Sequence, residues 1–417
     1  MPRPVAYAIL VAEAQMPIDL VRLALQVEGL AAELKAGERK AGERLESAVA
    51  ALWAQADALE QFRARLAASR TSWLVAGLVD GLGGRVSPPP CPGEFTVVAT
   101  DGSHIDVDRH SSVRCCLINI GSAVLRYGES PGAELVAVPQ LLFGDELIIA
   151  DPSAPGGGER VEGALLGLVR GVAECDALAA LLEGQPVERP VLGLIDGSLI
   201  LWGLAGRDFE EQKRFVREEL LDRRYLDALE RMRVRSGRGP CVPASYISYP
   251  RSADVVNALR VGLCPHDVAD CDRYCAGNRE RGCDAVSGVC DADLFAVLLM
   301  PGQRSEAFVS GSRFMQRHYG EHQICFFYLK LEEEVARVEV PRWVVDGGLL
   351  DLVHCLVLDQ CRRGLGYPVA LQEAHEQAVV TAACREQFWG LMEGVLAEGG
   401  VALGGSAKRM SKRTRWV

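Results

Sequence analysis

One short unit occurs twice in this chain: an apolar run of strand type that leads directly into Asp-Gly-Ser. The two copies span residues 97–103 and 192–198. Their β-branched and apolar residues predict buried strands, with Asp101 and Asp196 where the strands leave the sheet. A glycine after each aspartate lets a phosphate or another backbone segment approach closely. Asp-Gly is also a common turn pair, so either copy alone is compatible with an ordinary turn, and the repetition favours a functional site.

The order of the elements around these two copies indicates the fold class. Apolar stretches at residues 95–100, 114–120, 123–127 and 135–143 predict successive strands with short connections, which form an antiparallel meander. A helix over residues 161–182 and the second Asp-Gly-Ser strand follow, which completes a βββαβ order.

This order is that of the ribonuclease H-like fold, in which the fourth strand runs parallel to the first. We therefore predict an α/β protein with a ribonuclease H-like mixed sheet flanked by helices. Asp101 and Asp196 would lie side by side, where two carboxylates suit a hard divalent cation. Glu174 on the intervening helix can complete the acidic set, although it lies off the apolar stripe of the helix. A solvated helix residue is the alternative for Glu174, and Glu162 is a rival acid.

The first 86 residues predict a helical segment. Apolar residues recur in steps of three and four from Leu20 to Leu34 and from Leu45 to Leu59, which is typical of a coiled-coil seam. Glycines and dense charge at residues 35–44 indicate a weak point in one long helix or the bend of a helical hairpin. Such a seam packs on its own domain or on a second copy of the chain, so a homodimer is one expectation.

A proline-rich stretch at residues 87–93 marks a boundary, because consecutive prolines do not fit a helix or a central strand. We predict a second domain over residues 95–400, with a cysteine-rich insertion at 262–292. A basic tail over residues 401–417 ends the sequence. It is either a contact for nucleic acid or a partner, or a flexible solubilising end.

The insertion contains Cys264, Cys271, Cys275 and Cys283 in a glycine- and charge-rich stretch. Thiolates this dense can hold a structural Zn²⁺ ion or an iron–sulfur cluster. The spacing lacks a Cys-x-x-Cys pair, so free or incidentally buried thiols are the alternative. The 14 cysteines of the chain are too sparse for a disulfide scaffold, and the N-terminus only faintly mimics a signal peptide. We therefore expect a cytoplasmic protein.

Composition excludes some functional classes. The net charge of -11 argues against a protein that coats nucleic acid non-specifically, although a carboxylate-rich nuclease site remains compatible with it. No apolar run is long enough to cross a bilayer, so no membrane partner is expected. The sequence has no Gly-x-x-x-x-Gly-Lys-Ser/Thr loop, so the chain is not expected to be a P-loop motor.

The second half of the chain supplies further elements. Helices are predicted at residues 210–235 and 345–361, and strands at 242–249, 324–329 and 335–340. Arg304 and Arg313, each beside small residues, predict contacts with DNA phosphates, with surface ion pairs as the alternative.

Residues 366–376 predict a short strand that runs into the last long helix, with Tyr367 and His375 on either side of the turn. His375 at a helix start can bind a metal or orient an attacking water, and Tyr367 can hydrogen-bond a phosphate. A structural histidine is the alternative.

In their order, these features resemble the NurA nuclease family. The matching residues are Asp101-Gly102-Ser103 after a strand, Glu174 on the next helix, Ile195-Asp196-Gly197-Ser198-Leu199, Tyr246-Ile247-Ser248, and Gly366-Tyr367-Pro368 through Glu373-Ala374-His375. The resemblance runs from about residue 95 to the C-terminal helix, and the N-terminal helical seam is compatible with it.

The resemblance implies a DNA repair nuclease with a ribonuclease H-like domain. The activity would be that of a Mn²⁺-dependent deoxyribonuclease, with Mg²⁺ as an alternative ion. The enzyme would act as a 5′–3′ exonuclease, and endonuclease action on single strands is a second expectation. It would resect double-strand breaks as a homodimer docked on a hexameric HerA helicase. Carried over to this chain, Asp101, Glu174 and Asp196 would bind metal. His375 would be a ligand or water-orienting group, and Tyr367 would contact the scissile region.

Two other functions fit the same sequence. A catalytically weak, dimeric adaptor of a DNA translocase would depend on the helical seam and the basic tail. A ribonuclease H-like enzyme acting on RNA would share the acidic site, because the sequence contains no recognisable reader of the 2′-hydroxyl.

Overall fold

The computed structural model describes residues 19–108, 113–275, 277 and 281–401, without the side chains at 31, 32, 34 and 36. The signal-like N-terminus and all but the first residue of the basic tail lie outside this part of the chain. Within it, no helix combines the length and apolar character needed to cross a membrane.

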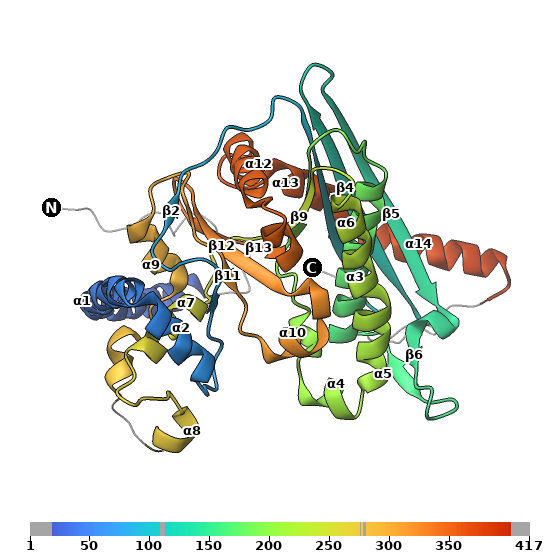
Figure 1. Cartoon of the computed structure of the whole chain (residues 1–417). Helices are drawn as coiled ribbons and strands as arrows, with labels where there is room; N and C mark the ends of the chain where they lie inside the picture. The colour runs from blue at the N-terminus through green and yellow to red at the C-terminus, as the bar shows by residue number, and fades with distance from the viewer. Residues whose placement is uncertain (1–18, 109–112, 276, 278–280, 402–417) are drawn as a thin grey trace.

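One large mixed sheet runs through the molecule (Figure 1). Its strands, in spatial order, are β1 (Gly77–Leu78), β11 (Phe308–Val309), β12 (Ile324–Lys330), β13 (Val335–Pro341), β9 (Cys241–Ile247), β8 (Val191–Asp196), β3 (Phe95–Ile105), β4 (Cys115–Tyr127) and β5 (Gly132–Phe143). Two short strands join beside this path, β2 (Arg85–Val86) and β10 (Arg304–Ser305), and β6 (Ile148–Ala150) pairs with β7 (Gly158–Arg160) in a separate ribbon.

The predicted βββαβ order is present. Strands β3, β4 and β5 form an antiparallel meander, the helix α3 (Ala164–Glu183) follows, and β8 returns parallel to β3. The predicted strands 324–329 and 335–340 are confirmed as the antiparallel pair β12 and β13.

The two strands predicted at 114–120 and 123–127 are in fact one strand, β4. Gly121 does not turn the chain. It lies opposite Asp101 in the sheet, under α13 (Val369–Ala378), and a Cβ there would overlap backbone atoms of Ala374 and Ala378. This glycine therefore serves the close approach of a helix to the sheet.

Helices cover both faces of β3 and β8. Because successive side chains of a strand point to opposite faces, Val98 belongs to the core under α3 and α6 (Leu226–Ser236), whereas Val97 belongs to the core under α12 (Leu350–Arg363) and α13. In Figure 1, α3 and α6 lie in front of the long strands. Burial on both faces explains why the two strands are continuously apolar.

The remaining helices correct several predictions. The helix predicted at 210–235 is divided into four segments, and that at 345–361 is interrupted at Gly348, which has a φ of +69°. The strand predicted directly before α13 is absent, because residues 364–368 form a turn. The other helices are α2 (Leu59–Ala68), α4 (Arg207–Glu211), α5 (Arg214–Arg217), the π-helical η4 (Glu218–Tyr225), α7 (Asp254–Gly262), α8 (Cys271–Tyr274), α9 (Asp291–Leu298), α10 (Arg313–His318), α11 (Arg342–Asp346) and α14 (Ala382–Glu398).

The N-terminal seam forms one helix, α1 (Leu20–Asp57), that continues through the predicted bend. In its second half, Leu52 is buried in a cluster with Val255 of α7 and Leu294 of α9, so this half packs within its own chain. In its first half the seam is exposed, for example at Leu23 and Val27, and the Leu34 side chain is not described. A coiled coil is therefore not confirmed. The boundaries at residues 86 and 95 stay predictions, although β1 and β2 join the main sheet.

The position of Gly121 predicts a stability effect. We expect Gly121→Ala to lower the free energy of unfolding by about 1–3 kcal/mol, because the new methyl group overlaps the backbone of α13. Urea denaturation of purified protein measures this change. Gly167→Ala in α3 is the matched control: a Cβ there meets nothing within 4 Å, and the variant should be neutral or more stable by about 0.5–1 kcal/mol. Equal stabilities of the two variants would contradict the role of Gly121.

Candidate active site

Asp101 and Asp196 come from neighbouring parallel strands. The register pairs Thr100 with Ile195, and its continuation by one residue places the two aspartates side by side. Asp196 ends β8 as predicted, and Gly197 turns the chain with a φ of +89°. Asp101, in contrast, does not end its strand, because β3 continues to Ile105. The prediction of an aspartate in a glycine turn is therefore right for the second copy and wrong for the first.

The glycine after Asp101 makes room for Glu174. A Cβ at Gly102 would overlap the Glu174 carboxylate, which comes from α3. Glu174 is 7% exposed and therefore belongs to the buried face of α3. This differs from the alternative that its position off the apolar stripe suggested, a solvated helix residue. Glu162 precedes α3, and its side chain lies at another cavity. The structure thus brings Glu174, and not Glu162, to the two aspartates.

Because the carboxyl groups of Asp101, Glu174 and Asp196 lie near one another, the ionisation of each one makes the ionisation of the others less favourable. Burial raises the pKa of Glu174 to about 8, Arg170 opposes this shift, and the charges of Asp101 and Asp196 add to it. The pKa of Asp196 is also raised, by partial burial and by Asp101, although its side chain stays accessible to solvent. Arg170 Nε and Glu174 Oε1 are 3.0 Å apart but are not aligned for a hydrogen bond, and both atoms are buried without a hydrogen-bond partner among the described residues.

His375 reaches the site from the opposite face of the sheet. It lies in the last turn of α13, not at a helix start as predicted, and its Nδ1 is 2.7 Å from Asp101 Oδ2. Asn119 of β4 donates to the carbonyl oxygens of Gln377 and Ala378, at 3.0 and 2.9 Å, and so fixes the end of α13. The His375 side chain is 60% exposed, which leaves its second nitrogen open to solvent.

Tyr367 lies in the turn before α13, with its hydroxyl group close enough to the Asp196 carboxylate for each group to shift the pKa of the other. Burial, followed by the charge of Asp196, raises the pKa of the Tyr367 hydroxyl, so this hydroxyl stays protonated at neutral pH. Its ring packs edge-to-face on buried Tyr246, with centroids 5.5 Å apart. The structure therefore brings Tyr367 and His375 to the same two aspartates.

Glu339 of β13, which belongs to none of the sequence motifs, supports the second Asp-Gly-Ser copy. Its Oε2 accepts hydrogen bonds from Ser198 Oγ and Leu199 N, at 2.8 and 2.9 Å, and its Oε1 accepts from Arg337 Nε at 2.9 Å. Arg337 in turn pairs with Asp254 at 2.7 Å, and all three charged groups are buried. The available signal was a pair of charged residues within a strand that is otherwise apolar.

The donor set suits a hard divalent cation, because it consists of carboxylate oxygens, one of them buried without a hydrogen bond. As the side chains stand, however, the described residues contain no group of three or more His, Cys, Asp or Glu that could hold a metal ion. Metal binding therefore remains a proposal.

Comparisons with known proteins identify the family. The family model of the NurA domain matches residues 95–380. The chain belongs to the NurA family. This membership supports a nuclease-related, hydrolytic role connected with DNA and its repair. No curated protein gives a significant match. Among solved structures, the crystal structure of Drosophila Piwi is 8% identical, with a TM-score of 0.25, over 70% of this chain and 30% of that chain, and so weak a similarity carries no argument.

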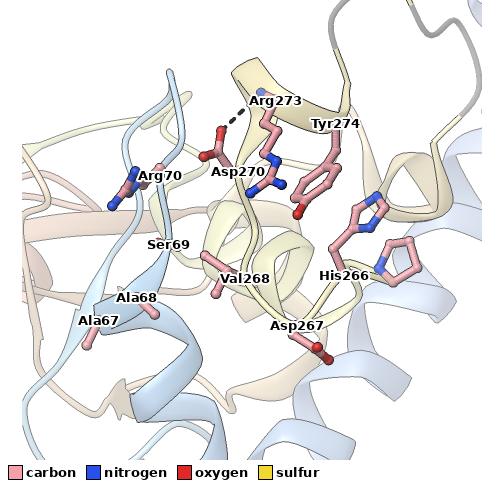
Figure 2. A pocket seen from close by; sticks show the side chains of 11 residues that line it. Ala67, Ala68, Ser69, Arg70, His266, Asp267, Val268, Asp270, Arg273 and Tyr274 are labelled. Atoms are coloured by element: carbon pink, nitrogen blue, oxygen red, sulfur yellow. Dashed lines mark hydrogen bonds between the residues drawn. The ribbon is translucent and has the colours of Figure 1, made fainter.

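The cysteine-rich insertion lies within the NurA domain but apart from the carboxylates. Burial and the neighbouring thiols of Cys275, Cys283 and Cys264 raise the pKa of Cys271 to about 11. Three thiols thus lie within electrostatic reach of Cys271, but as the side chains stand the described residues form no group of three that could hold a metal ion. A Zn²⁺ or iron–sulfur site here stays a prediction. A cavity of about 760 Å³ also lies at this insertion (Figure 2), with the rings of His266 and Tyr274 stacked 4.0 Å apart.

The two arginines predicted to bind DNA lie outside the acidic site. Arg304 is buried, forms an ion pair with Asp351 at 3.2 Å and packs over the ring of Phe327. It therefore has the ion pair that was the alternative to a DNA contact, although the pair is not on the surface. Arg313 is exposed, and its Nη2 donates to the carbonyl oxygen of Thr71 at 3.4 Å. Contacts of these arginines with DNA remain untested predictions.

The raised pKa of Glu174 predicts how stability depends on pH without metal. The unfolded chain releases this proton near pH 4.5 and the folded chain near pH 8, so the stability contributed by the protonated form is complete below pH 4.5 and lost as pH rises to 8. We expect Glu174→Gln to abolish this loss and to exceed the wild type by on the order of 3 kcal/mol at about pH 8.5.

Urea denaturation in EDTA at a series of pH values measures this difference. Glu162→Gln serves as the control and should keep the wild-type dependence on pH. If Glu174→Gln loses stability with pH as steeply as the wild type does, the carboxylate cluster does not carry the predicted electrostatic cost.

Proposed function

We propose that this NurA family member is a metal-dependent deoxyribonuclease that uses Mn²⁺ or Mg²⁺. The observation that carries the proposal is the convergence of Asp101, Asp196 and buried Glu174 from two strands and a helix, at a place where each negative charge opposes the next. Such crowding is costly in an isolated protein and becomes favourable around divalent cations.

In this proposal Asp101 and Asp196 bind the cations from the sheet, and Glu174 binds them through the gap above Gly102. Divalent cations in such a site activate water and neutralise charge on the attacking and leaving oxygens of a phosphodiester. Buried Glu174 must give up its proton first, since its pKa of about 8 lies above that of an ordinary glutamate. At limiting ion concentration, metal binding should therefore strengthen as the pH rises toward 8.

His375 and Tyr367 would act on the water and the phosphate. With the Nδ1–H of His375 donating to Asp101 Oδ2, its Nε2 is left as an acceptor or ligand on the solvent side. The protonated Tyr367 hydroxyl is a donor that can shift from Asp196 to a phosphate oxygen. Both residues thus support the chemistry as positioning or proton-handling groups.

The finer properties rest on the family. The βββαβ order and the parallel β3–β8 pair support a ribonuclease H-like fold. We propose 5′–3′ exonuclease action, with endonuclease action on single strands as a second activity. The enzyme would act during resection of double-strand breaks in the cytoplasm. Because the sequence lacks a P-loop, ATP-driven movement along DNA would come from a HerA-type helicase partner.

Removal of one central carboxylate tests the proposal. We expect Asp101→Asn to lower Mn²⁺-dependent cleavage of end-labelled DNA by on the order of 100-fold or more, because several kcal/mol of transition-state stabilisation would be lost. Asp176→Asn, an exposed residue of α3 that pairs with Arg231, is the control and should cleave normally. The substrates are single- and double-stranded DNA labelled at either end, and RNA, with and without a HerA-type partner.

Each outcome of this assay favours one function. Preferred cleavage of RNA would favour the ribonuclease alternative, and no cleavage of any substrate with the partner present would favour the adaptor. Thermal denaturation with Mn²⁺ reports metal binding without cleavage: the ion should raise the melting temperature of the wild type and not that of Asp101→Asn.

We also propose that the chain forms a homodimer. The apolar residues of the first half of α1, including Leu20, Leu23, Val27 and Leu30, have no cover in the described part of the chain. Their steps of three and four residues match a helix–helix seam, for which a second copy of α1 is the simplest partner.

Charged substitutions in this seam test the dimer. We expect the double variant Leu23→Lys and Val27→Lys to change the mass in solution from two chains to one, because buried lysines would disrupt an apolar seam. Light scattering measures the mass. Glu28→Lys, an exposed position of the same helix, should leave the dimer intact. An unchanged dimer in the double variant would exclude this surface.

A further inference from the structure

A cavity of about 450 Å³ lies directly beside the acidic site, and the proposed chemistry does not use it. Tyr367 lines this cavity, and its hydroxyl group is near enough to Asp196 that each raises or lowers the pKa of the other, so the cavity and the carboxylates share one side chain. Volumes of this order are typical of sites for small molecules. Only the Tyr367 side chain would therefore separate a group bound in the cavity from a phosphate bound at the Asp196 site.

Two residues on the rim of this cavity have unusual backbone conformations. Tyr249 and Leu365 have φ values of 44° and 56°, and within the described ranges they are the only residues other than glycine with positive φ. Such conformations cost about 1–3 kcal/mol each for bulky side chains and are enriched at ligand clamps and active sites. That of Leu365 also ends α12, because the bond from Gly366 N to the carbonyl oxygen of Cys361 requires a left-handed residue between them. Tyr249 also precedes Pro250, which restricts its backbone further.

These conformations do not serve the hydrophobic core, because Tyr249 is 71% exposed and Leu365 is 98% exposed. The surroundings nevertheless hold them in place. Buried Glu334 accepts hydrogen bonds from Tyr246 Oη and Ser248 Oγ, both at 2.7 Å, and from Tyr249 N at 3.3 Å. On the other side of the rim, Gly366 N donates to the carbonyl oxygen of Cys361 at 2.8 Å. The rim is thus a preformed pair of apolar walls exposed to solvent.

The charges at the cavity indicate which chemistry fits. Exposed Glu332 and Glu333 and buried Glu334 line it together with Arg362, so the carboxylates outnumber the positive charge. A phosphate inside would meet net repulsion, whereas N–H groups would find acceptors. Tyr249, Leu365 and Tyr367 offer apolar and aromatic surfaces to a flat ring. An uncharged, planar ring with N–H donors on its edge is the description of a nucleobase.

We propose that this cavity binds one unpaired nucleobase of the strand whose phosphate is held through divalent cations at Asp101 and Asp196, with Tyr249 and Leu365 as its stacking walls. The inference rests on the proposed nuclease function and specifies its substrate. A paired base cannot enter the cavity, because its edge is occupied by the opposite strand. The enzyme would therefore act on single strands and on duplex ends that have frayed or been unwound.

Binding of a fluorescent strand tests this inference without cleavage. Short single strands with 2-aminopurine at successive positions are mixed with the full chain in Ca²⁺, a hard cation that carboxylates bind, in place of Mn²⁺. We expect quenching at one position, where the base stacks in the cavity. Tyr249→Gly and Leu365→Gly should each weaken binding about tenfold, the scale of one lost base–aromatic or base–aliphatic stack.

The glycine variants also separate a binding role from a structural one. Glycine adopts positive φ without strain, so both variants should melt at the wild-type temperature or above it while they lose affinity. Leu391→Ala, which removes another exposed leucine on α14, is the matched control and should leave binding and quenching unchanged. A loss of affinity that accompanies a loss of stability would assign the two residues a structural role and overturn the inference.

Two further results decide between the inference and the proposed function. Equal binding by the wild type and both glycine variants, or by intact strands and strands with an abasic nucleotide at any position, would overturn the base site. Position-specific quenching without cleavage in Mn²⁺ would keep the base site and reject the nuclease. Cleavage that does not depend on Tyr249 or Leu365 would keep the nuclease and reject the base site.

Discussion

The parallel pairing of β3 with β8 is the constraint on which the candidate active site depends. Both strands are buried on both faces, so a shift in register would misplace apolar side chains in two cores at once. The same register sets Asp101 beside Asp196. Two like charges in adjacent positions destabilise one another, and the packing of the sheet offsets that cost. The site therefore stores electrostatic strain that a cation would relieve.

Two glycines let helices bring further groups to this pair. Gly102 opens one face of β3 to Glu174 of α3, and Gly121 opens the other face of the sheet to α13, which carries His375. A side chain at Gly121 would push α13 away from the strands, whereas one at Gly102 would displace the Glu174 carboxylate. The site is therefore assembled from both faces of one sheet. Buried polar groups below it, above all Glu339, hold the loop after Asp196 in a single conformation.

Local patterns predicted the elements better than their junctions. Alternating and continuous apolar runs located β3, β8, β12 and β13, because burial determines composition directly. The apolar pattern divides β4 into two predicted strands, at 114–120 and 123–127, because a glycine needed for helix packing, such as Gly121, looks the same in sequence as one needed for a turn. His375 was placed at a helix start for a similar reason: the turn that contains Tyr367 has strand-like residues but no partner strand. Glu174 looked solvated because an apolar stripe does not reveal that Gly102 leaves space for a carboxylate.

The sequence by itself determined the family and the βββαβ order, and it pointed to Asp101 and Asp196 through the repeated Asp-Gly-Ser unit, because these follow from composition and order along the chain. It also pointed to Tyr367 and His375 through the resemblance. Only the tertiary structure decided that Glu174 and not Glu162 joins the aspartates, that Glu339 supports them, and that Tyr249 and Leu365 flank a cavity beside them. Those facts depend on contacts between segments far apart in the chain and on backbone angles, and neither leaves a periodic trace in the sequence.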